Sequence, residues 1–232
     1  MMRQGGTRWS VRLCSTLVLV LSFVLVGSQW TRFSAQLTSG PRHEPFGTLL
    51  GISDGQVQVY SCDSATSPLL PQSNNLNGIF TGLKWQCVEL ARRWLLVNEG
   101  WVFDDVDVAF DIFSLTFGKR LDGTKVDLKS YSNGSRVRPR KGSMIIWKKG
   151  GAMETTGHVA ISVEVSDSFV RVVEQNVFDA IWPQGQNFSR ELSASVDEHG
   201  GYWITDSFFD EKTLVLGWIH AANPVQGESI AR

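Results

Sequence analysis

The chain has 232 residues, of which 42% are hydrophobic and 19% are charged, and its formal net charge is −1. This apolar content is enough for one well-packed domain, which excludes disorder over most of the chain. A nearly neutral chain without long basic runs has no electrostatic footprint for nucleic acid, and the basic segment 138–141 (RPRK) is too short to change this.

An apolar segment near the amino terminus indicates targeting to a membrane system. Residues 13–26 (LCSTLVLVLSFVLV) carry no charge and follow Arg3, Arg8 and Arg12. The run is shorter than the roughly 20 residues of a comfortable membrane span, and small residues follow it at plausible cleavage positions. We therefore interpret residues 1–28 as a signal peptide or, alternatively, as a signal anchor. Either would place the domain in the secretory pathway, secreted or held by one amino-terminal membrane segment.

The cysteines do not suggest a domain held together by disulfides. Cys14 lies in the apolar run, so only Cys62 and Cys87 remain for the domain, and disulfide-stapled secreted domains have more. Two Asn-X-Ser sequences, at Asn133 and Asn187, are compatible with export.

The first half of the chain is expected to begin with a linker and a loop-rich region. Residues 29–46 are polar with small side chains and indicate a linker, followed by a domain at 47–223 and a tail at 224–232. Residues 56–61 (QVQVYS) alternate polar and apolar side chains, as a half-buried strand or arm does. Residues 67–78, with two prolines, three asparagines and a glycine, predict a loop.

Two helices are expected next. Residues 87–100 (CVELARRWLLVNEG) are largely apolar and end in a glycine that is suited to capping a helix. Residues 106–118 carry Val108, Ile112 and Leu115 at helical spacing.

The remainder of the domain is predicted to form short strands after a turn-rich connection at 131–143. These strands cover residues 144–147, 158–165, 168–177, 202–209 and 214–221. Helices followed by antiparallel strands indicate the α+β class.

Cys87 is a candidate nucleophile because it stands at the start of a predicted helix. The unsatisfied N–H groups and the dipole of a helix start favour the thiolate and can receive an oxyanion. A cysteine without a partner at this position is more often a buried core residue. The interpretation of Cys87 therefore depends on its partners.

A base and an acid are predicted to meet at one end of a hairpin. His158 begins one strand, and a turn at 165–168 would lay the next strand antiparallel to it, so that His158 comes near Glu174 and Asn176. Each residue alone has an ordinary structural role, but a buried glutamate in an apolar strand needs a partner such as an imidazolium. The order is cysteine, histidine, then glutamate or asparagine. With the cysteine on a helix and the histidine on a sheet, this is the arrangement of papain-like thiol hydrolases.

Metal and nucleotide chemistry have no basis in the sequence. The four histidines (His43, His158, His199 and His220) are scattered, and the chain has no CxxC or HxxxH pattern. It also lacks GxxxxGK[ST] and GxGxxG. We therefore expect neither a metal nor a cofactor.

The segments around the three candidate residues resemble the CHAP family of cysteine amidohydrolases and peptidases. The resemblance is carried by 84–94 (KWQCVELARRW), 157–161 (GHVAI) and 174–177 (EQNV). It extends from about Gly47 to Trp218 against the amidase domain of glutathionylspermidine synthetase/amidase and trypanothione synthetase. It implies a papain-like CHAP fold, in which amino-terminal helices, one of them beginning at the nucleophile, pack on an antiparallel sheet.

The resemblance also implies roles for individual residues. Cys87 would be the nucleophile, His158 the general base and later acid, and Glu174 the residue that orients the imidazole. The positions that match those binding a glutathionyl group are Gln86, Arg92, Val106, Asp107, Val108, Ala109 and Asn176. Arg92 falls about 140° around the helix from Cys87, so we expect it at the rim of the site, bound to a carboxylate, or alternatively, with Arg93, on a solvated helix face.

The expected reaction is hydrolysis of a glutathione–polyamine amide, glutathionylspermidine to glutathione plus spermidine, through a thioester. The backbone N–H of Cys87 and a donor of Gln86 would receive the oxyanion. We expect no synthetase domain in this chain.

Export is at odds with the cytosolic metabolism of the resembled enzymes, and this leaves two alternatives open. The first is an exported CHAP endopeptidase or amidase that cleaves a peptide substrate in peptidoglycan. The second is a non-catalytic, membrane-tethered binding module whose nine tryptophans present a sugar-binding surface. Most of these tryptophans, including Trp94, Trp147 and Trp218, fall in apolar segments and are expected in the core.

Overall fold

The computed structural model describes residues 43–222 of the chain. The predicted targeting segment at 1–28, most of the predicted linker and the predicted tail therefore lie outside the described residues. Within residues 43–222, no helix is both long enough and apolar enough to cross a bilayer.

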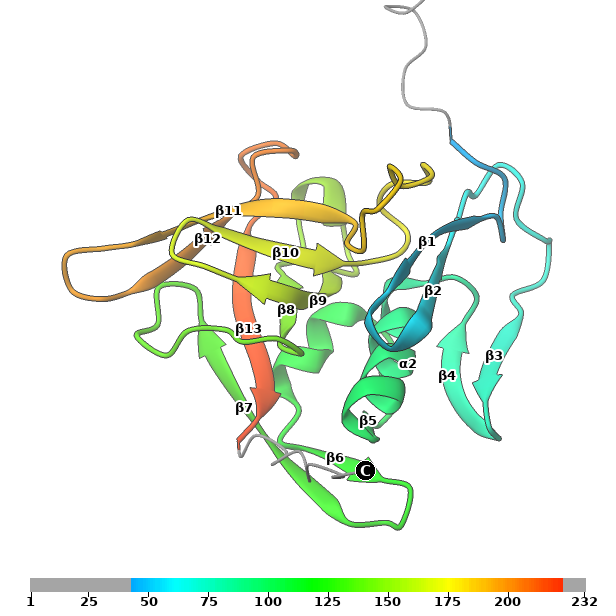
Figure 1. The fold of residues 1–232 in the computed structure, drawn as a ribbon, viewed down its shortest axis with the longest axis horizontal. Coiled ribbons are helices and arrows are strands. Elements are labelled where there is room, and N and C mark those ends of the chain that lie inside the picture. Colours follow the sequence, from blue (N-terminus) through cyan, green and yellow to red (C-terminus); the bar gives the residue numbers. More distant parts are fainter. Residues whose placement is uncertain (1–42, 223–232) are drawn as a thin grey trace, which may run out of the picture. The chain divides into compact units, whose positions relative to one another are not determined.

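A nine-stranded antiparallel sheet forms the centre of the described region, and its strands follow the order β12-β11-β10-β9-β8-β13-β7-β6-β5 (Figure 1). Consecutive strands β8 to β12 form a meander, and β13 lies between β8 and β7. The bounds are β5 Trp101–Phe103, β6 Phe117–Arg120, β7 Lys125–Ser132, β8 Met144–Trp147, β9 His158–Val165, β10 Phe169–Val173, β11 Arg190–Val196, β12 Tyr202–Thr205 and β13 Val215–Ala221.

Two hairpins and one α-helix precede most of this sheet. The hairpins pair β1 (Leu49–Ser53) with β2 (Val57–Tyr60) and β3 (Ser73–Leu76) with β4 (Ile79–Leu83). Helix α2 runs over Cys87–Glu99 and ends at Gly100, whose φ of 69° is left-handed and suits glycine. Short 3-10 helices lie at η1 Asp54–Gln56, η2 Ala109–Ser114 and η3 Gly151–Met153.

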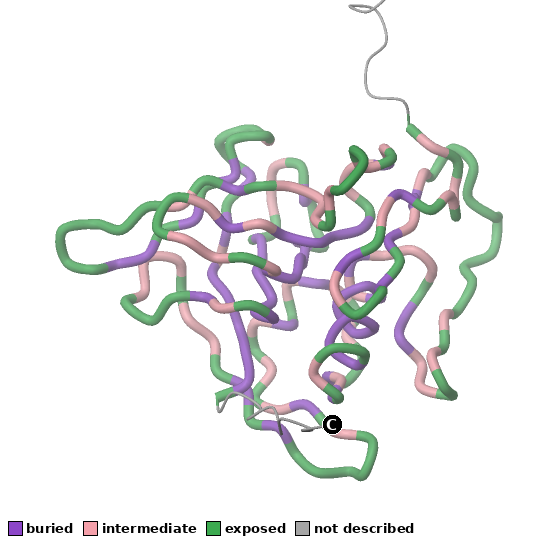
Figure 2. Tube along the Cα trace, in the orientation of Figure 1, coloured by how far each residue is buried: buried purple, intermediate pink, exposed green. Residues whose placement is uncertain are grey.

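The main core lies between α2 and one face of the sheet. Leu90, Trp94 and Leu95 of the helix pack with Met144 and Ile146 of β8 in one cluster of buried side chains. Figure 2 shows α2 and the central strands as mostly buried. This packing fixes the start of α2 against the sheet, which matters for the position of Cys87.

A second core lies on the opposite face of the same strands. Side chains alternate along a strand, so Ile145 and Trp147 of β8 point away from α2 and join Leu192 of β11 and Ile204 of β12. The meander therefore curves, and its outer strands cover the face opposite the helix.

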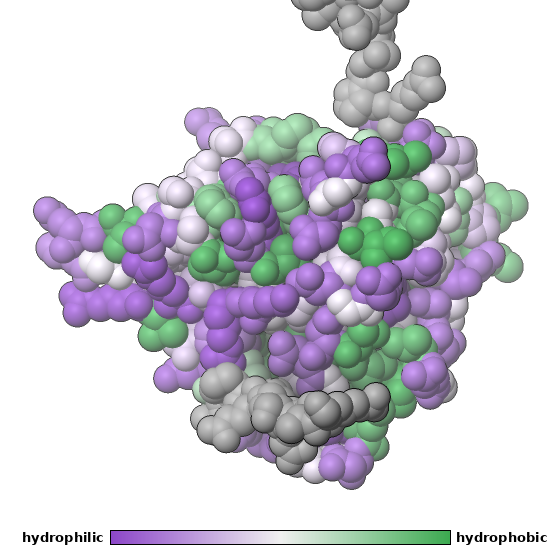
Figure 3. All heavy atoms as spheres, viewed as in Figure 1, coloured by the Kyte–Doolittle hydropathy of each residue, from purple (hydrophilic) through white to green (hydrophobic). Residues whose placement is uncertain are grey.

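Four of the seven tryptophans among residues 43–222 are fully buried: Trp94, Trp101, Trp147 and Trp218. The expectation of core positions for Trp94, Trp147 and Trp218 is confirmed. On the face shown in Figure 3, hydrophobic residues are interspersed with hydrophilic ones. Among the described residues, Trp203 is the one tryptophan in the set of large exposed hydrophobic side chains, so a surface of stacked tryptophans has little support.

The predicted α+β class and most of the late strands are confirmed. The predicted strands at 144–147 and 158–165 coincide with β8 and β9, and the one at 214–221 begins one residue later, at Val215. Strands β10 and β12 are shorter than predicted, because they end at Val173 and Thr205.

The predicted helix over 106–118 is wrong. Only Ala109–Ser114 are helical, as a 3-10 turn, and Phe117–Arg120 form strand β6. The buried residues of the turn, Ala109 and Ile112, are three residues apart, which is the period of a 3-10 helix. The predicted architecture has more than one amino-terminal helix, whereas residues 43–222 contain one α-helix, α2.

Two predicted connections contain strands instead. Residues 73–76 of the predicted loop form β3, and the first two residues of the predicted turn-rich segment complete β7. Both strands are placed by pairing with a neighbour, β4 and β13 respectively, which a local pattern does not reveal.

Asn133, one of the two predicted glycosylation sequences, is engaged inside the fold. Its Nδ2 donates to the carbonyl of Ile204 at 2.9 Å, and its Oδ1 accepts from the N–H of Ile204 at 2.8 Å. A glycan on Nδ2 would have to displace the first bond, so Asn133 is unsuited to modification in the folded state.

Candidate active site

Cys87 is the first residue of α2, and its thiol lies against the sheet. The sulfur is hydrogen-bonded to the side chain of His158 and to the backbone N–H groups of Val88 and Val159. Burial alone would raise the pKa of the thiol. The charge and hydrogen bond of His158, helped by the two N–H groups, outweigh this and hold the pKa of Cys87 below its ordinary value.

His158 is the first residue of β9 and links the thiol to Glu174. Its Nε2 lies 2.9 Å from Oε2 of Glu174, which leaves Nδ1 for the sulfur. The two side chains are almost fully buried, with 3% and 4% of their residues' surfaces exposed. Burial lowers the pKa of the imidazole, but the thiolate of Cys87 and the carboxylate of Glu174 raise it to about 9.

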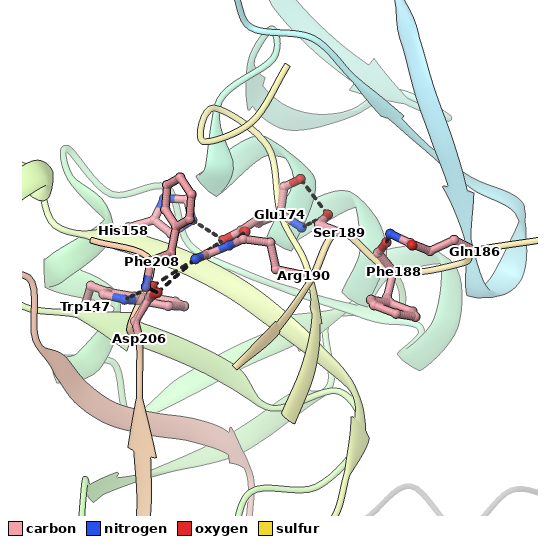
Figure 4. Close-up of polar contacts among 9 residues, drawn as sticks. All are labelled: Trp147, His158, Glu174, Gln186, Phe188, Ser189, Arg190, Asp206 and Phe208. Atoms are coloured by element: carbon pink, nitrogen blue, oxygen red, sulfur yellow. Dashed lines mark hydrogen bonds and ion pairs between the residues drawn. The ribbon is translucent and has the colours of Figure 1, made fainter. Parts of the chain in front are cut away.

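Glu174 follows directly after β10 and has a second cationic partner. Arg190, the first residue of β11, donates from Nε to Oε1 and from Nη2 to Oε2, the latter at 3.3 Å (Figure 4). The backbone N–H of Glu174 donates to Oγ of Ser189 at 2.9 Å. Burial raises the pKa of the carboxyl, yet Arg190 and His158 lower it to about 2.

A further acid completes the row. Asp206, directly after β12, accepts from Nη1 and Nη2 of Arg190, both at 3.0 Å, and from Nε1 of Trp147 at 3.1 Å (Figure 4). Neither Arg190 nor Asp206 was predicted from the sequence as a site residue. No local motif marks them, since the contact depends on the pairing of β10 with β11 and of β11 with β12.

A cavity of about 480 Å³ opens onto Cys87 and His158. It is lined by several residues predicted to bind substrate: Gln86, Val106, Asp107, Val108, Ala109 and Asn176. Asn176 Nδ2 donates to Oε1 of Gln86 at 2.9 Å, and both residues line this cavity and a neighbouring one. The structure thus brings these six predicted residues to the same space as the thiol.

Arg92 is a correction to the predicted site. Its side chain is buried and does not line the cavity. The guanidinium donates to the carbonyl of Phe103 at 2.6 Å and to that of Phe80 at 2.8 Å, so it ties β5 to β4. The alternative of a solvated face is also wrong, because Arg93 is buried as well and pairs with Glu89 at 2.7 Å. The rotation along the helix correctly predicts that Arg92 points away from the sulfur. It does not reveal that β4 and β5 cover the Arg92 side chain.

The expected oxyanion donor at Gln86 also needs correction in part. The backbone N–H of Gln86 already donates to the carbonyl of Leu83 at 2.9 Å. Its side-chain Nε2 donates to the sulfur of Cys62 at 3.3 Å, and sulfur is a weak acceptor. The side-chain amide is therefore the part of Gln86 that remains exchangeable.

One group of potential metal ligands occurs among the described residues. Ligand atoms of His43, Asp63 and Asp179 lie within 4.8 Å of one another, and none of these residues lines the cavity at Cys87. The carboxylates already accept hydrogen bonds from their own surroundings, including the N–H of Cys62 to Asp179 at 2.7 Å. We assign this group no part in the chemistry of the thiol.

Comparison with known proteins agrees with this geometry. Residues 78–176, which include Cys87, His158 and Glu174, match the family model of the CHAP domain. The chain is 44% identical over 184 residues to the bifunctional glutathionylspermidine synthetase/amidase of Escherichia coli (strain K12). The aligned region covers 75% of this chain and 29% of that protein.

Two proteins of Crithidia fasciculata are also similar. A trypanothione synthetase is 30% identical over 182 residues, covering 77% of this chain and 27% of that protein. A glutathionylspermidine synthase is 31% identical over 205 residues, covering 80% of this chain and 28% of that protein. The chain thus spans less than a third of the length of these relatives.

Proposed function

Since residues 78–176 match the CHAP domain, we propose that the chain is a cysteine-dependent amidohydrolase that cleaves glutathionylspermidine to glutathione and spermidine. The observation that carries the proposal is the buried, hydrogen-bonded row of Cys87, His158 and Glu174 at the head of a helix. The substrate is proposed from the similarity to the synthetase/amidase. A thiol on a helix facing an imidazole on a sheet also supports the papain-like form of the fold.

The first half of the reaction forms a thioester. The thiolate of Cys87 attacks the carbonyl carbon of the glycyl amide, and the carbonyl oxygen becomes an oxyanion. The N–H of Cys87 has no intrahelical partner because it is the first of the helix, so it can donate to this oxygen. Nε2 of Gln86 is the second donor, once it exchanges the sulfur of Cys62 for the stronger acceptor.

The second half releases both products. The imidazolium of His158 gives its proton to the amine nitrogen, the C–N bond breaks, and spermidine leaves. The neutral imidazole then takes a proton from water, whose oxygen attacks the thioester. Cleavage of the C–S bond releases glutathione, and the thiolate and imidazolium are restored.

The residues that line the cavity are proposed to hold the glutathionyl part of the substrate. Val108 is extended, with φ −142° and ψ 152°, and it stands between Asp107 and the η2 turn. Gln86 and Asn176 close the other side of the same cavity.

The test is release of spermidine from glutathionylspermidine by the purified protein, followed by chromatography of the derivatised amine. Cys87→Ala should abolish release, while Cys62→Ala should retain it. A parallel incubation with bacterial sacculi addresses the alternative substrate. Solubilised wall without spermidine release would replace the proposed substrate by a peptidoglycan peptide and keep the same catalytic residues.

We further propose that residues 1–28 deliver the domain to the secretory pathway. The support is the uncharged run at 13–26 behind three arginines. The mass of the mature protein distinguishes a cleaved signal peptide from an anchor, and extraction of membranes with carbonate tests whether the uncleaved form stays bound.

A further inference from the structure

Arg190 stands between the proposed catalytic row and the interior of the meander. Its guanidinium is bound on one side to both oxygens of Glu174 and on the other to both oxygens of Asp206 (Figure 4). Trp147, directly before the loop that leads to His158, donates to the same Asp206. The arginine is therefore held at two ends, and neither end belongs to its own strand.

Buried charges alternate in sign along this row. With the thiolate and imidazolium formed, the order is Cys87 negative, His158 positive, Glu174 negative, Arg190 positive and Asp206 negative. A buried charge without an opposite neighbour is strongly unfavourable, and here each of the three inner charges has one on both sides. Removing one of these charged side chains therefore leaves its neighbours as buried charges with one opposite partner fewer, which is unfavourable.

Aromatic rings restrict the guanidinium further. Its central carbon lies within 6.0 Å of the ring centroids of Trp147, Phe178, Phe208 and Phe209, which come from different strands and loops. Such rings attract a cation and leave a planar group few orientations.

Glu174 needs this support because the sheet does not fix its carboxylate. Strand β10 ends at Val173, so Glu174 follows the last paired residue. Its bond to His158 uses one oxygen, which alone leaves the carboxylate free to rotate. The two bonds from Arg190 define the plane of the group and turn Oε2 toward Nε2 of His158.

We propose that Arg190, anchored by Asp206, is a positioning residue that orients Glu174 and thereby the imidazole that activates Cys87. The role rests on the proposed function only in that Cys87 must be the nucleophile. A positioning role differs from a purely structural one in its effect on the thiol of a protein that remains folded.

The experiment measures the rate at which iodoacetamide alkylates Cys87 as a function of pH, read from the mass of the Cys87 peptide. Arg190→Lys keeps the charge and loses the planar fork. Asp206→Asn removes the charge of the anchor and leaves in place Trp147, whose ring lies edge-on to that of His158 with centroids 5.2 Å apart. Arg171→Lys is the matched control, since Arg171 also joins two acids, Glu164 and Glu191, at the surface. Near-ultraviolet circular dichroism checks the fold of each protein.

In the wild-type protein, alkylation should persist well below pH 7. In Arg190→Lys and Asp206→Asn, the acid limb should move up by about one pH unit, so that the rate at pH 6 falls about tenfold, the lower end of the loss seen when groups that orient metal-bound histidines are removed. Arg171→Lys should match the wild type. Spermidine release should fall in kcat with little change in KM.

The results separate this proposal from the proposed function. An unchanged acid limb in folded Arg190→Lys would overturn the positioning role, whatever the substrate. If Arg190→Lys does not fold, Asp206→Asn decides, because it should slow alkylation at pH 6 and an unchanged rate would overturn the role. If the acid limb shifts in the variants but the wild type releases no spermidine, the positioning role stands and the proposed substrate is wrong.

Discussion

Asn176 Nδ2 donates to Oε1 of Gln86 at 2.9 Å and thereby joins the loop after β10 to the residue before α2. Asn176 has a φ of 63°, a left-handed conformation that asparagine and glycine tolerate better than other residues. The bond fixes the side chain that we propose as the second oxyanion donor.

Asn176→Gly should lower kcat/KM for glutathionylspermidine by about tenfold, because it keeps the backbone conformation and removes the hold on Gln86. Steady-state kinetics measure the effect. Asn77→Gly is the matched control, since Asn77 also has a positive φ, 51°, in the turn between β3 and β4. Equal kinetics for the two variants would contradict a role for the bond.

Iodoacetamide at pH 7 should label Cys87 and leave Cys62 almost unmodified. Burial raises the pKa of the Cys62 thiol to about 11, whereas His158 lowers that of Cys87. Peptide masses after short exposure show which cysteine carries the label. Equal labelling of both thiols, at the rate of a free thiol, would favour the non-catalytic binding module.

Glu174→Gln should lower kcat by at least about tenfold and move the alkaline limb of activity below pH 9. The carboxylate is one of the groups that raise the pKa of His158, so a neutral amide weakens the imidazolium. Glu191→Gln, an exposed acid on the same strand as Arg190, is the control and should leave the profile unchanged.

Activity should follow a bell-shaped pH profile with its alkaline limb near pH 9. The imidazolium is lost as pH rises through the pKa of His158, about 9, and the thiolate is lost as pH falls through the lowered pKa of Cys87. Initial rates of spermidine release across pH 4 to 10 measure it. An alkaline limb near the ordinary histidine value of about 6.5 would contradict the assignment.

The same shifts predict how stability depends on pH. His158 has a raised pKa, so its contribution is complete below about pH 6.5 and disappears as pH rises through about 9. Glu174 has a lowered pKa, so its contribution is present above about pH 4.5 and disappears as pH falls through about 2. Thermal melting at pH 7 and pH 3 should show a larger loss of Tm in the wild type than in Glu174→Gln, since only the wild type has this carboxylate to protonate.

Arg92→Lys should destabilise the fold by about 1–3 kcal/mol and leave KM nearly unchanged. A lysine cannot reach the two carbonyls of Phe80 and Phe103 together, so one buried acceptor loses its donor. Urea denaturation measures the loss, with Arg138→Lys, at an exposed ion pair, as the control. A large increase in KM without loss of stability would restore Arg92 to the substrate site.

The sequence was sufficient to predict the row from Cys87 to Glu174, because each residue stands at a boundary that local patterns reveal. Cys87 begins a helix, His158 begins a strand, and one hairpin turn determines that Glu174 returns to His158. Arg190 and Asp206 were not predictable in this way. Their contacts cross strand pairs whose register no local pattern fixes.

The errors in the fold have the same origin. The helix expected over 106–118 followed the spacing of apolar residues, but pairing of β6 with β7 gives its last two residues, 117 and 118, an extended conformation. Arg92 was placed by rotation around one helix, while the carbonyls it binds belong to β4 and β5. In both cases a partner distant in sequence outweighed the local preference.

Strand β13 lies between β8 and β7, although the ribosome makes it after β12. Strands β7 and β8 both pair with β13 and not with each other, so the two halves of the sheet are joined through the last strand of the domain. Joining the two halves is therefore a non-local step, and we expect it to be slower than formation of the meander from β8 to β12, whose strands pair with their neighbours in sequence.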